Sequence, residues 1–172
     1  MAGFFYLKTL VFFKGIIEND GKIKSGVVMG AIIKKLEVIL ADTYALYLKT
    51  QNYHWHVKGV QFKSLHELFE MQYRALAEAI DQIAERILIM GHKAPATFTA
   101  LNQLKTIKDG DSSIDANKMV SELAQDNGVL VKDLNAAIKL AQEDGDEGTV
   151  ALLSERIAAH EKARWMLNAS TV

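Results

Sequence analysis

Residues 64–90 read SLHELFEMQYRALAEAIDQIAERILIM and set the architecture of the chain. Their apolar side chains recur every three or four positions, which is the period of one face of an α-helix. These positions are Leu65, Leu68, Phe69, Tyr73, Leu76, Ile80, Ile83 and Ile87. Ser64 with Glu67 predicts a capping box at the start of the helix, and Gly91 ends the pattern. We therefore expect one long amphipathic helix that turns a continuous apolar face toward a core.

Three further segments have the same periodicity. Residues 31–56 contain neither Gly nor Pro, residues 119–144 run to a stop at Asp144-Gly145-Asp146, and a fourth pattern extends from Val150 to Leu167. A long crossover separates the second and third helices, with one short helix expected over residues 98–104. Two helix hairpins joined by one long crossover have the connectivity of a ferritin-like bundle. The prediction is an all-α, ferritin-like four-helix bundle.

The composition narrows the chemistry that the chain can support. Its 172 residues, of which 49% are hydrophobic and 24% charged, are typical of one soluble globular domain. Because there is no cysteine, disulfides and thiolate metal sites are excluded, and any metal site must use His, Asp and Glu. A net charge of −1 does not indicate a general nucleic-acid binder.

Residues 1–30 differ in composition from the rest and are expected to form an N-terminal arm, ahead of a domain at 31–169 and a short tail at 170–172. Residues 4–17 read FFYLKTLVFFKGII, in which Lys8 and Lys14 interrupt a run too short to span a membrane. Two interpretations remain open. The apolar composition favours an arm buried on its own bundle or on a neighbouring subunit; six lysines against two acids in residues 1–35 would suit a basic arm that grips phosphates.

A set of polar residues interrupts the apolar pattern at helical spacing. His66 with Glu70, and Asp81 with Glu85, are pairs four residues apart, so each pair lies on one helix face and could hold a cation. His54 continues the inward stripe of the first helix. Each signal alone has an ordinary explanation, a solvated acid or a hydrogen-bonded core histidine. Together they favour a metal centre with imidazole and carboxylate ligands, which suit iron, manganese or zinc.

The spacing also predicts that one chain cannot complete this centre. Glu70 and Asp81 are eleven residues apart on one helix, about 16 Å at a rise of 1.5 Å per residue. A two-fold axis crossing antiparallel second helices would bring His66 and Glu70 of one subunit beside Asp81 and Glu85 of its mate. No histidine has Glu three residues before it, which disfavours a di-iron site inside one bundle. We therefore expect a dimer at least.

Three segments resemble the Dps family, the DNA-binding proteins from starved cells. They are ADTYALYLKTQNYHWHVKG (residues 41–59), FKSLHELFEMQYRALAEAIDQIAERI (62–87) and HEKARWML (160–167). The resemblance implies a hollow dodecamer whose ferroxidase centres lie at two-fold interfaces and hold two iron ions each. The implied ligands are His54, His66 and Glu70 of one subunit with Asp81 and Glu85 of the other. It further implies oxidation of ferrous iron, usually by hydrogen peroxide, storage of ferric iron, and protection of DNA and the cell in the cytoplasm.

Other positions carry weaker expectations. Trp55, beside the centre, would either take up a stray oxidising equivalent, as the resemblance suggests, or serve only in packing. The resemblance also implies acidic iron-entry pores, for which Asp144, Asp146 and Glu147 are the candidates, although an acidic helix-capping turn is the stronger explanation of these residues. The C-terminus lacks the basic tail with which Dps proteins commonly bind DNA. This difference disfavours DNA binding. Two alternatives to a ferroxidase stay open: a metal-free helical scaffold, and a nucleoid-binding protein in which iron is secondary, which rests on the lysines at 8, 14, 22, 24, 34 and 35.

Overall fold

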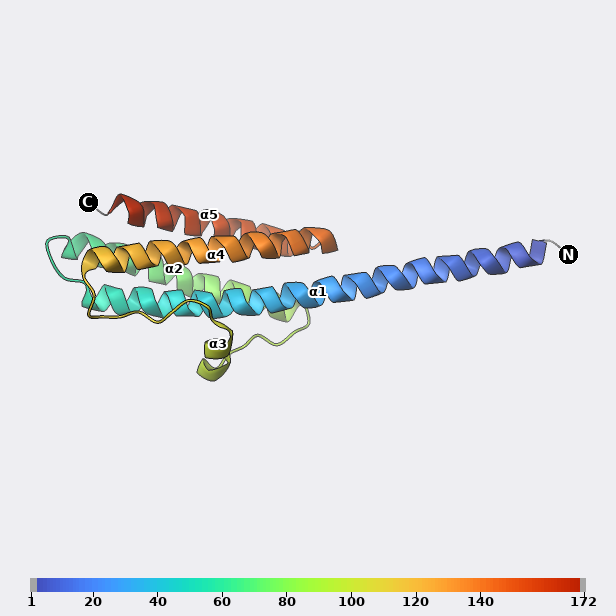
Figure 1. Ribbon diagram of the computed structural model, residues 1–172, viewed down its shortest axis with the longest axis horizontal. Helices are drawn as coiled ribbons and strands as arrows, with labels where there is room; N and C mark the ends of the chain where they lie inside the picture. Colours follow the sequence, from blue (N-terminus) through green and yellow to red (C-terminus); the bar gives the residue numbers. More distant parts are fainter. Residues whose placement is uncertain (1–2, 171–172) are drawn as a thin grey trace.

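The computed structural model describes the backbone of residues 3–170 and the side chains of residues 26–170. Within these residues the chain forms five helices and no strand. They are α1 (Gly3–His56), α2 (Phe62–Ile89), α3 (Phe98–Leu104), α4 (Ala116–Asp144) and α5 (Glu147–Ala169). The four long helices lie side by side, and the crossover that carries α3 runs from α2 to α4 along the outside of the bundle (Figure 1). The predicted all-α bundle and its long crossover are confirmed.

The core fills the space between the long helices. Fully buried side chains come from α1 (Leu36, Leu46), α2 (Phe69) and α4 (Leu123, Leu134). α1 packs against both α2 and α4, and α4 packs along α5, whereas α2 and α5 approach each other at few residues. The bundle is therefore tight on three sides and more open between α2 and α5.

Two helix starts differ from the prediction. α1 begins at Gly3 rather than near residue 31, and its N-terminal half extends beyond the bundle (Figure 1). The side chains of the arm up to residue 25 lie outside the described residues, so both interpretations of its contacts stay open. α2 begins at Phe62, two residues before Ser64. The prediction of a capping box is wrong, because the Ser64 hydroxyl donates instead to the Gln61 carbonyl at 3.0 Å.

The remaining helix ends agree with the sequence pattern. The short helix over residues 98–104 is present as α3, with the Thr97 side chain as its N-cap. α4 ends at Asp144 and is capped by Gly145, whose φ of 72° is the left-handed conformation that glycine adopts most easily. The Asp146 side chain then caps α5.

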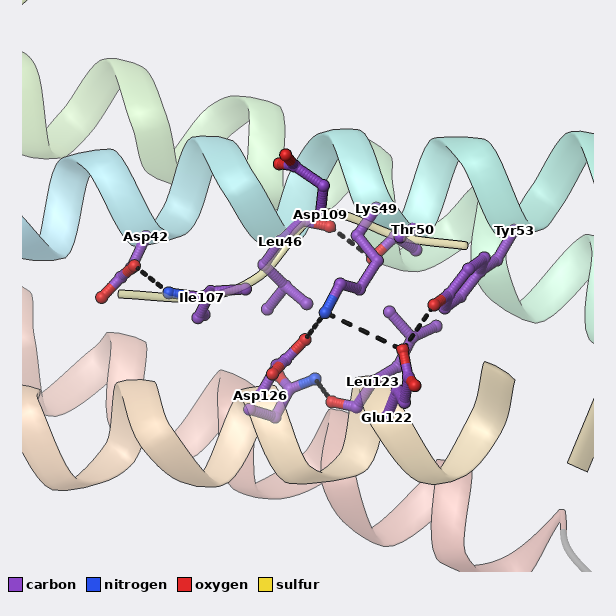
Figure 2. Close-up of polar contacts among 12 residues, drawn as sticks. Asp42, Leu46, Lys49, Thr50, Tyr53, Ile107, Asp109, Glu122, Leu123 and Asp126 are labelled. Atoms are coloured by element: carbon purple, nitrogen blue, oxygen red, sulfur yellow. Dashed lines mark hydrogen bonds and ion pairs between the residues drawn. The ribbon is translucent and has the colours of Figure 1, made fainter. Parts of the chain in front are cut away.

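Buried polar contacts attach the crossover to α1 and join α1 to α4 (Figure 2). The Asp42 carboxylate accepts hydrogen bonds from the backbone N–H groups of Thr106 and Ile107, at 2.6 and 2.8 Å. The Lys49 ammonium lies 2.6 Å from the Asp126 carboxylate of α4. Gly110 of the crossover packs so closely that a Cβ there would lie 2.9 Å from Cγ of Lys49. These contacts hold the long connection in one place although it contains a single short helix.

Candidate metal centre

His54 and His66 form a reciprocal pair across the short connection between α1 and α2. Their rings stack with centroids 3.7 Å apart and an interplanar angle of 19°. Nδ1 of His54 donates to the backbone carbonyl of His66 at 2.8 Å, and Nδ1 of His66 donates to the carbonyl of His54 at 2.7 Å. Because a carbonyl oxygen can only accept, both Nδ1 atoms carry the proton. In the neutral rings each Nε2 therefore keeps its lone pair for a metal ion.

Each ring of this pair also contacts an aromatic side chain. The Phe62 ring lies 5.1 Å from His66, and the Tyr73 ring meets His54 edge-on at 5.3 Å. Tyr47 in turn contacts Tyr73 edge-on at 6.1 Å. His54 is only 8% exposed. The sequence interpretation did not include Tyr73 in the site, although its distance of seven residues from His66 would place both on one helix face.

Glu70 follows His66 by one turn and is held by an arginine. Its Oε1 accepts from Nε and Nη2 of Arg74, at 3.0 and 2.5 Å. The Arg74 hydrogen bond is the main reason that the pKa of Glu70 lies below its ordinary value; burial opposes this shift, and the nearby His54 and His66 add to it. A cation at Glu70 would therefore compete with Arg74. The ion pair between these two residues could be predicted from the sequence, because they are four positions apart on one helix.

Asp81 and Glu85 are exposed on α2, beyond the histidine pair. The eleven residues between Glu70 and Asp81 run along one unbroken helix, so about 16 Å of rise separates their backbones. In the part of the chain that the structure describes, no three His, Asp or Glu side chains are placed to hold a metal ion together. The single chain thus brings His54 against His66, with Glu70 one turn away, and leaves the second carboxylate pair apart.

Comparison with known proteins assigns the family. The ferritin-like domain family matches residues 33–171. DNA protection during starvation protein 2 of Bacillus anthracis is 38% identical over 138 residues, covering 80% of this chain and 94% of that relative. The chain belongs to the Dps family.

Solved Dps structures have the same fold. A Dps protein of Vibrio cholerae, described as a member of a broad superfamily of ferritin-like diiron-carboxylate proteins, superimposes with a TM-score of 0.80 at 35% identity. The alignment covers 83% of this chain and 90% of that one. For a Dps protein of Bacillus brevis the TM-score is 0.81 at 36% identity, with coverage of 83% and 96%.

The other candidate residues of this Dps-family chain have varied surroundings. Trp55 is 59% exposed beside the histidine pair, and His56 is exposed because it lies about 200° round the helix from the inward-facing His54. Asp146 accepts from the Thr149 backbone and pairs with Arg86 at 2.5 Å. Burial disfavours its charged form, but the hydrogen bonds from Arg86 and Thr149 outweigh this and lower its pKa. Asp146 therefore has the capping role, while a pore formed with Asp144 and Glu147 stays a prediction.

None of the described helices is long and apolar enough to span a lipid bilayer. Of the lysines near the N-terminus, Lys34 is exposed, and Lys35 pairs with Asp133 of α4 at 3.2 Å. Lysines 8, 14, 22 and 24 belong to the segment whose side chains are not described.

Proposed function

We propose that this protein is a ferroxidase that oxidises ferrous iron at centres shared by two subunits and stores the ferric product in a cage of twelve. The observation that carries the proposal is the reciprocal hydrogen bonding of His54 and His66. It leaves the Nε2 atoms of both imidazoles available as metal ligands, and of the proposed carboxylate ligands the described part of the same chain places Glu70 one helical turn from His66. Asp81 and Glu85 of the partner subunit would complete each centre, which would take two iron ions as substrate.

The donor chemistry suits this substrate. Imidazole nitrogens and carboxylate oxygens without sulfur are ligands that ferrous and ferric iron accept. The backbone carbonyls fix the orientation of both rings, and an aromatic side chain contacts each of them. Glu70 would exchange its contact with the exposed Arg74 for a contact with the incoming cation.

The proposed reaction uses hydrogen peroxide as oxidant. Two ferrous ions each give up one electron, and one peroxide with two protons becomes two water molecules. Because the two electrons arrive at one site, no hydroxyl radical is released, which would protect DNA and the cell. Trp55 would take up a stray oxidising equivalent at such a site, with packing as the alternative role. A cytoplasmic location is part of the same proposal.

Mixed oligomers test whether two subunits share the centre. One variant, His66→Asn, removes a ligand from the subunit that supplies the histidines of a centre. The other, Asp81→Asn with Glu85→Gln, removes both carboxylate ligands that the partner subunit would supply. Each alone should form the cage but lose rapid ferrous oxidation by peroxide. Random mixing by co-expression should restore roughly a quarter of the wild-type centres, because half of the dimers are mixed and each has one intact site.

Two results would contradict the proposal. If mixed cages stay as inactive as the single variants, the two sides do not meet between subunits. If the Asp81/Glu85 variant oxidises iron at the wild-type rate, those carboxylates are not ligands. Glu67→Gln is the matched control, because Glu67 is an exposed acid on the same helix and should leave the rate unchanged.

DNA protection with iron oxidation secondary is the second candidate function. It rests on the exposed Lys34 and on the lysines of the arm, and relatives such as the Bacillus anthracis protein are named for protecting DNA during starvation. It predicts a gel shift with duplex DNA that weakens steeply as salt is raised. The absence of a shift at low salt would rule it out.

A further inference from the structure

A half-open cleft lies between α2 and α5, along the side of the bundle where these helices make the fewest contacts. Its volume is about 200 Å³, and most of its wall is apolar, including Met71, Leu76 and Met166. Cavities of about 150 Å³ accept a molecule the size of benzene, so this cleft has room for a small ligand. It lies apart from the histidine pair and contains none of the proposed iron ligands.

One polar group in the cleft is a buried histidine with a free nitrogen. His160 is 5% exposed, and its Nδ1 lies 2.8 Å from Oδ1 of Asn127. The Asn127 amide nitrogen donates to the Leu123 carbonyl, so Oδ1 is the acceptor and Nδ1 of His160 carries the proton. Burial, with a smaller effect from Arg156, lowers the pKa of His160 to about 4. At neutral pH its Nε2 is therefore an acceptor, and no described residue donates to it.

A second polar group of the cleft is the Arg156 guanidinium, and the cleft is also lined by Gln72, Asn127 and Lys162. Arg156 precedes His160 by four residues, which places both on one face of α5. Its side chain is 12% exposed, and its Nε is buried without a hydrogen-bond partner. Among the described residues its ion pair is with the exposed Glu155, 3.5 Å from Nη2. Because Glu155 is 69% exposed, this pair lies largely in water and offsets little of the cost of burying the guanidinium, and an anion in the cleft would add a second, buried counter-charge.

We infer that the cleft binds an amphipathic hydroxy acid, a carboxylate that carries a neighbouring hydroxyl group and an apolar chain. The carboxylate would pair with the Arg156 guanidinium where it lines the cleft, and the hydroxyl would donate to Nε2 of His160. The chain would lie against Met71, Leu76 and Met166. An inorganic phosphate fits less well, because a dianion would lose its water against a mostly apolar wall. This inference does not depend on iron oxidation.

The test is calorimetric titration of the assembled, iron-free, full-length protein with 2-hydroxyoctanoate, octanoate and inorganic phosphate. We expect saturable binding of 2-hydroxyoctanoate, weaker binding of octanoate because the donor to His160 is missing, and the weakest binding of phosphate. Arg156→Gln should weaken 2-hydroxyoctanoate binding about tenfold or more, as expected when a charge-assisted hydrogen bond is lost. Arg164→Gln is the matched control, since Arg164 is an exposed arginine on the same helix outside the cleft.

A second variant covers the case in which Arg156→Gln fails to assemble. Ala75 lines the cleft but is exposed on α2, so Ala75→Leu should fill the cleft without disturbing the core. It should abolish binding while circular dichroism and light scattering stay at wild-type values. The inference is overturned if 2-hydroxyoctanoate shows no saturable binding, if octanoate binds equally well, or if both assembled variants bind within about twofold of wild type.

Discussion

Replacing Lys49 by methionine should destabilise the protein strongly, because it would leave the largely buried Asp126 carboxylate without its cation. The Lys49 side chain is 3% exposed, and its Nζ lies 2.6 Å from Asp126 and 4.0 Å from Glu122 (Figure 2). Burial already raises the pKa of Asp126 above its ordinary value, although the Lys49 hydrogen bond opposes this shift. Removing one partner of a buried ion pair costs about 3 to 5 kcal/mol. We expect Lys49→Met to lower the free energy of unfolding by about that amount.

Urea denaturation followed by far-ultraviolet circular dichroism measures this effect. All variants must be compared at the same protomer concentration, because the stability of an oligomer depends on concentration. Adding Asp126→Asn to Lys49→Met should recover about 2 kcal/mol, since the uncompensated carboxylate is then gone. Lys132→Met, at an exposed position of α4, is the control and should change stability by less than about 0.5 kcal/mol.

The reasoning is refuted by either of two results. Lys49→Met within about 1 kcal/mol of wild type would mean that the ion pair with Asp126 adds little to stability. Additive effects of the two substitutions, within about 0.5 kcal/mol, would mean that the two side chains are not coupled in solution.

Three further effects follow from the same structure. Gly110→Ala should lower the free energy of unfolding by about 1 to 3 kcal/mol, because the new Cβ would lie 2.9 Å from Cγ of Lys49. Thermal unfolding measures this effect. Gly128→Ala is the control and should change stability little, because the nearest atom to its Cβ would be 3.6 Å away. His160 has a folded pKa of about 4 against 6.5 for the free group, so the unfolded chain binds more protons between these values and stability rises with pH there. About 3 kcal/mol should be lost as pH falls from 6.5 to 4, and urea denaturation of His160→Gln should show a flatter pH profile. Asp146→Ala should cost about 1 to 3 kcal/mol in the same assay, because it removes the cap of α5 and the ion pair with Arg86.

Each of these expectations has a result that contradicts it. Equal melting temperatures for Gly110→Ala and wild type would show that the crossover shifts to accommodate the added methyl group without loss of stability. A pH profile that His160→Gln leaves unchanged would assign the acid sensitivity to other groups. For Asp146, an alanine variant as stable as wild type would remove its structural role and favour the pore interpretation.

Much of the architecture could be predicted from local spacing. Periodicities of three and four residues mark the long helices, and Gly145 marks the turn between α4 and α5, since helix formation depends on neighbours within a few positions. The prediction of a short helix over 98–104 is confirmed for the same reason. The start of α2 was misplaced, because Ser64 can bond backward to a carbonyl as readily as it can cap a helix.

The spacing also predicted His54, His66 and Glu70 as metal-site residues. It gave no information on how the imidazole rings of the two histidines pack against each other. Their reciprocal hydrogen bonds to each other's carbonyls depend on the angle at which α1 and α2 pack around the connecting loop. The pairing of Lys49 with Asp126 likewise joins residues 77 positions apart. Local sequence specifies which face of a helix is apolar; which polar groups meet depends on the register between helices, and register is set by packing of the whole core.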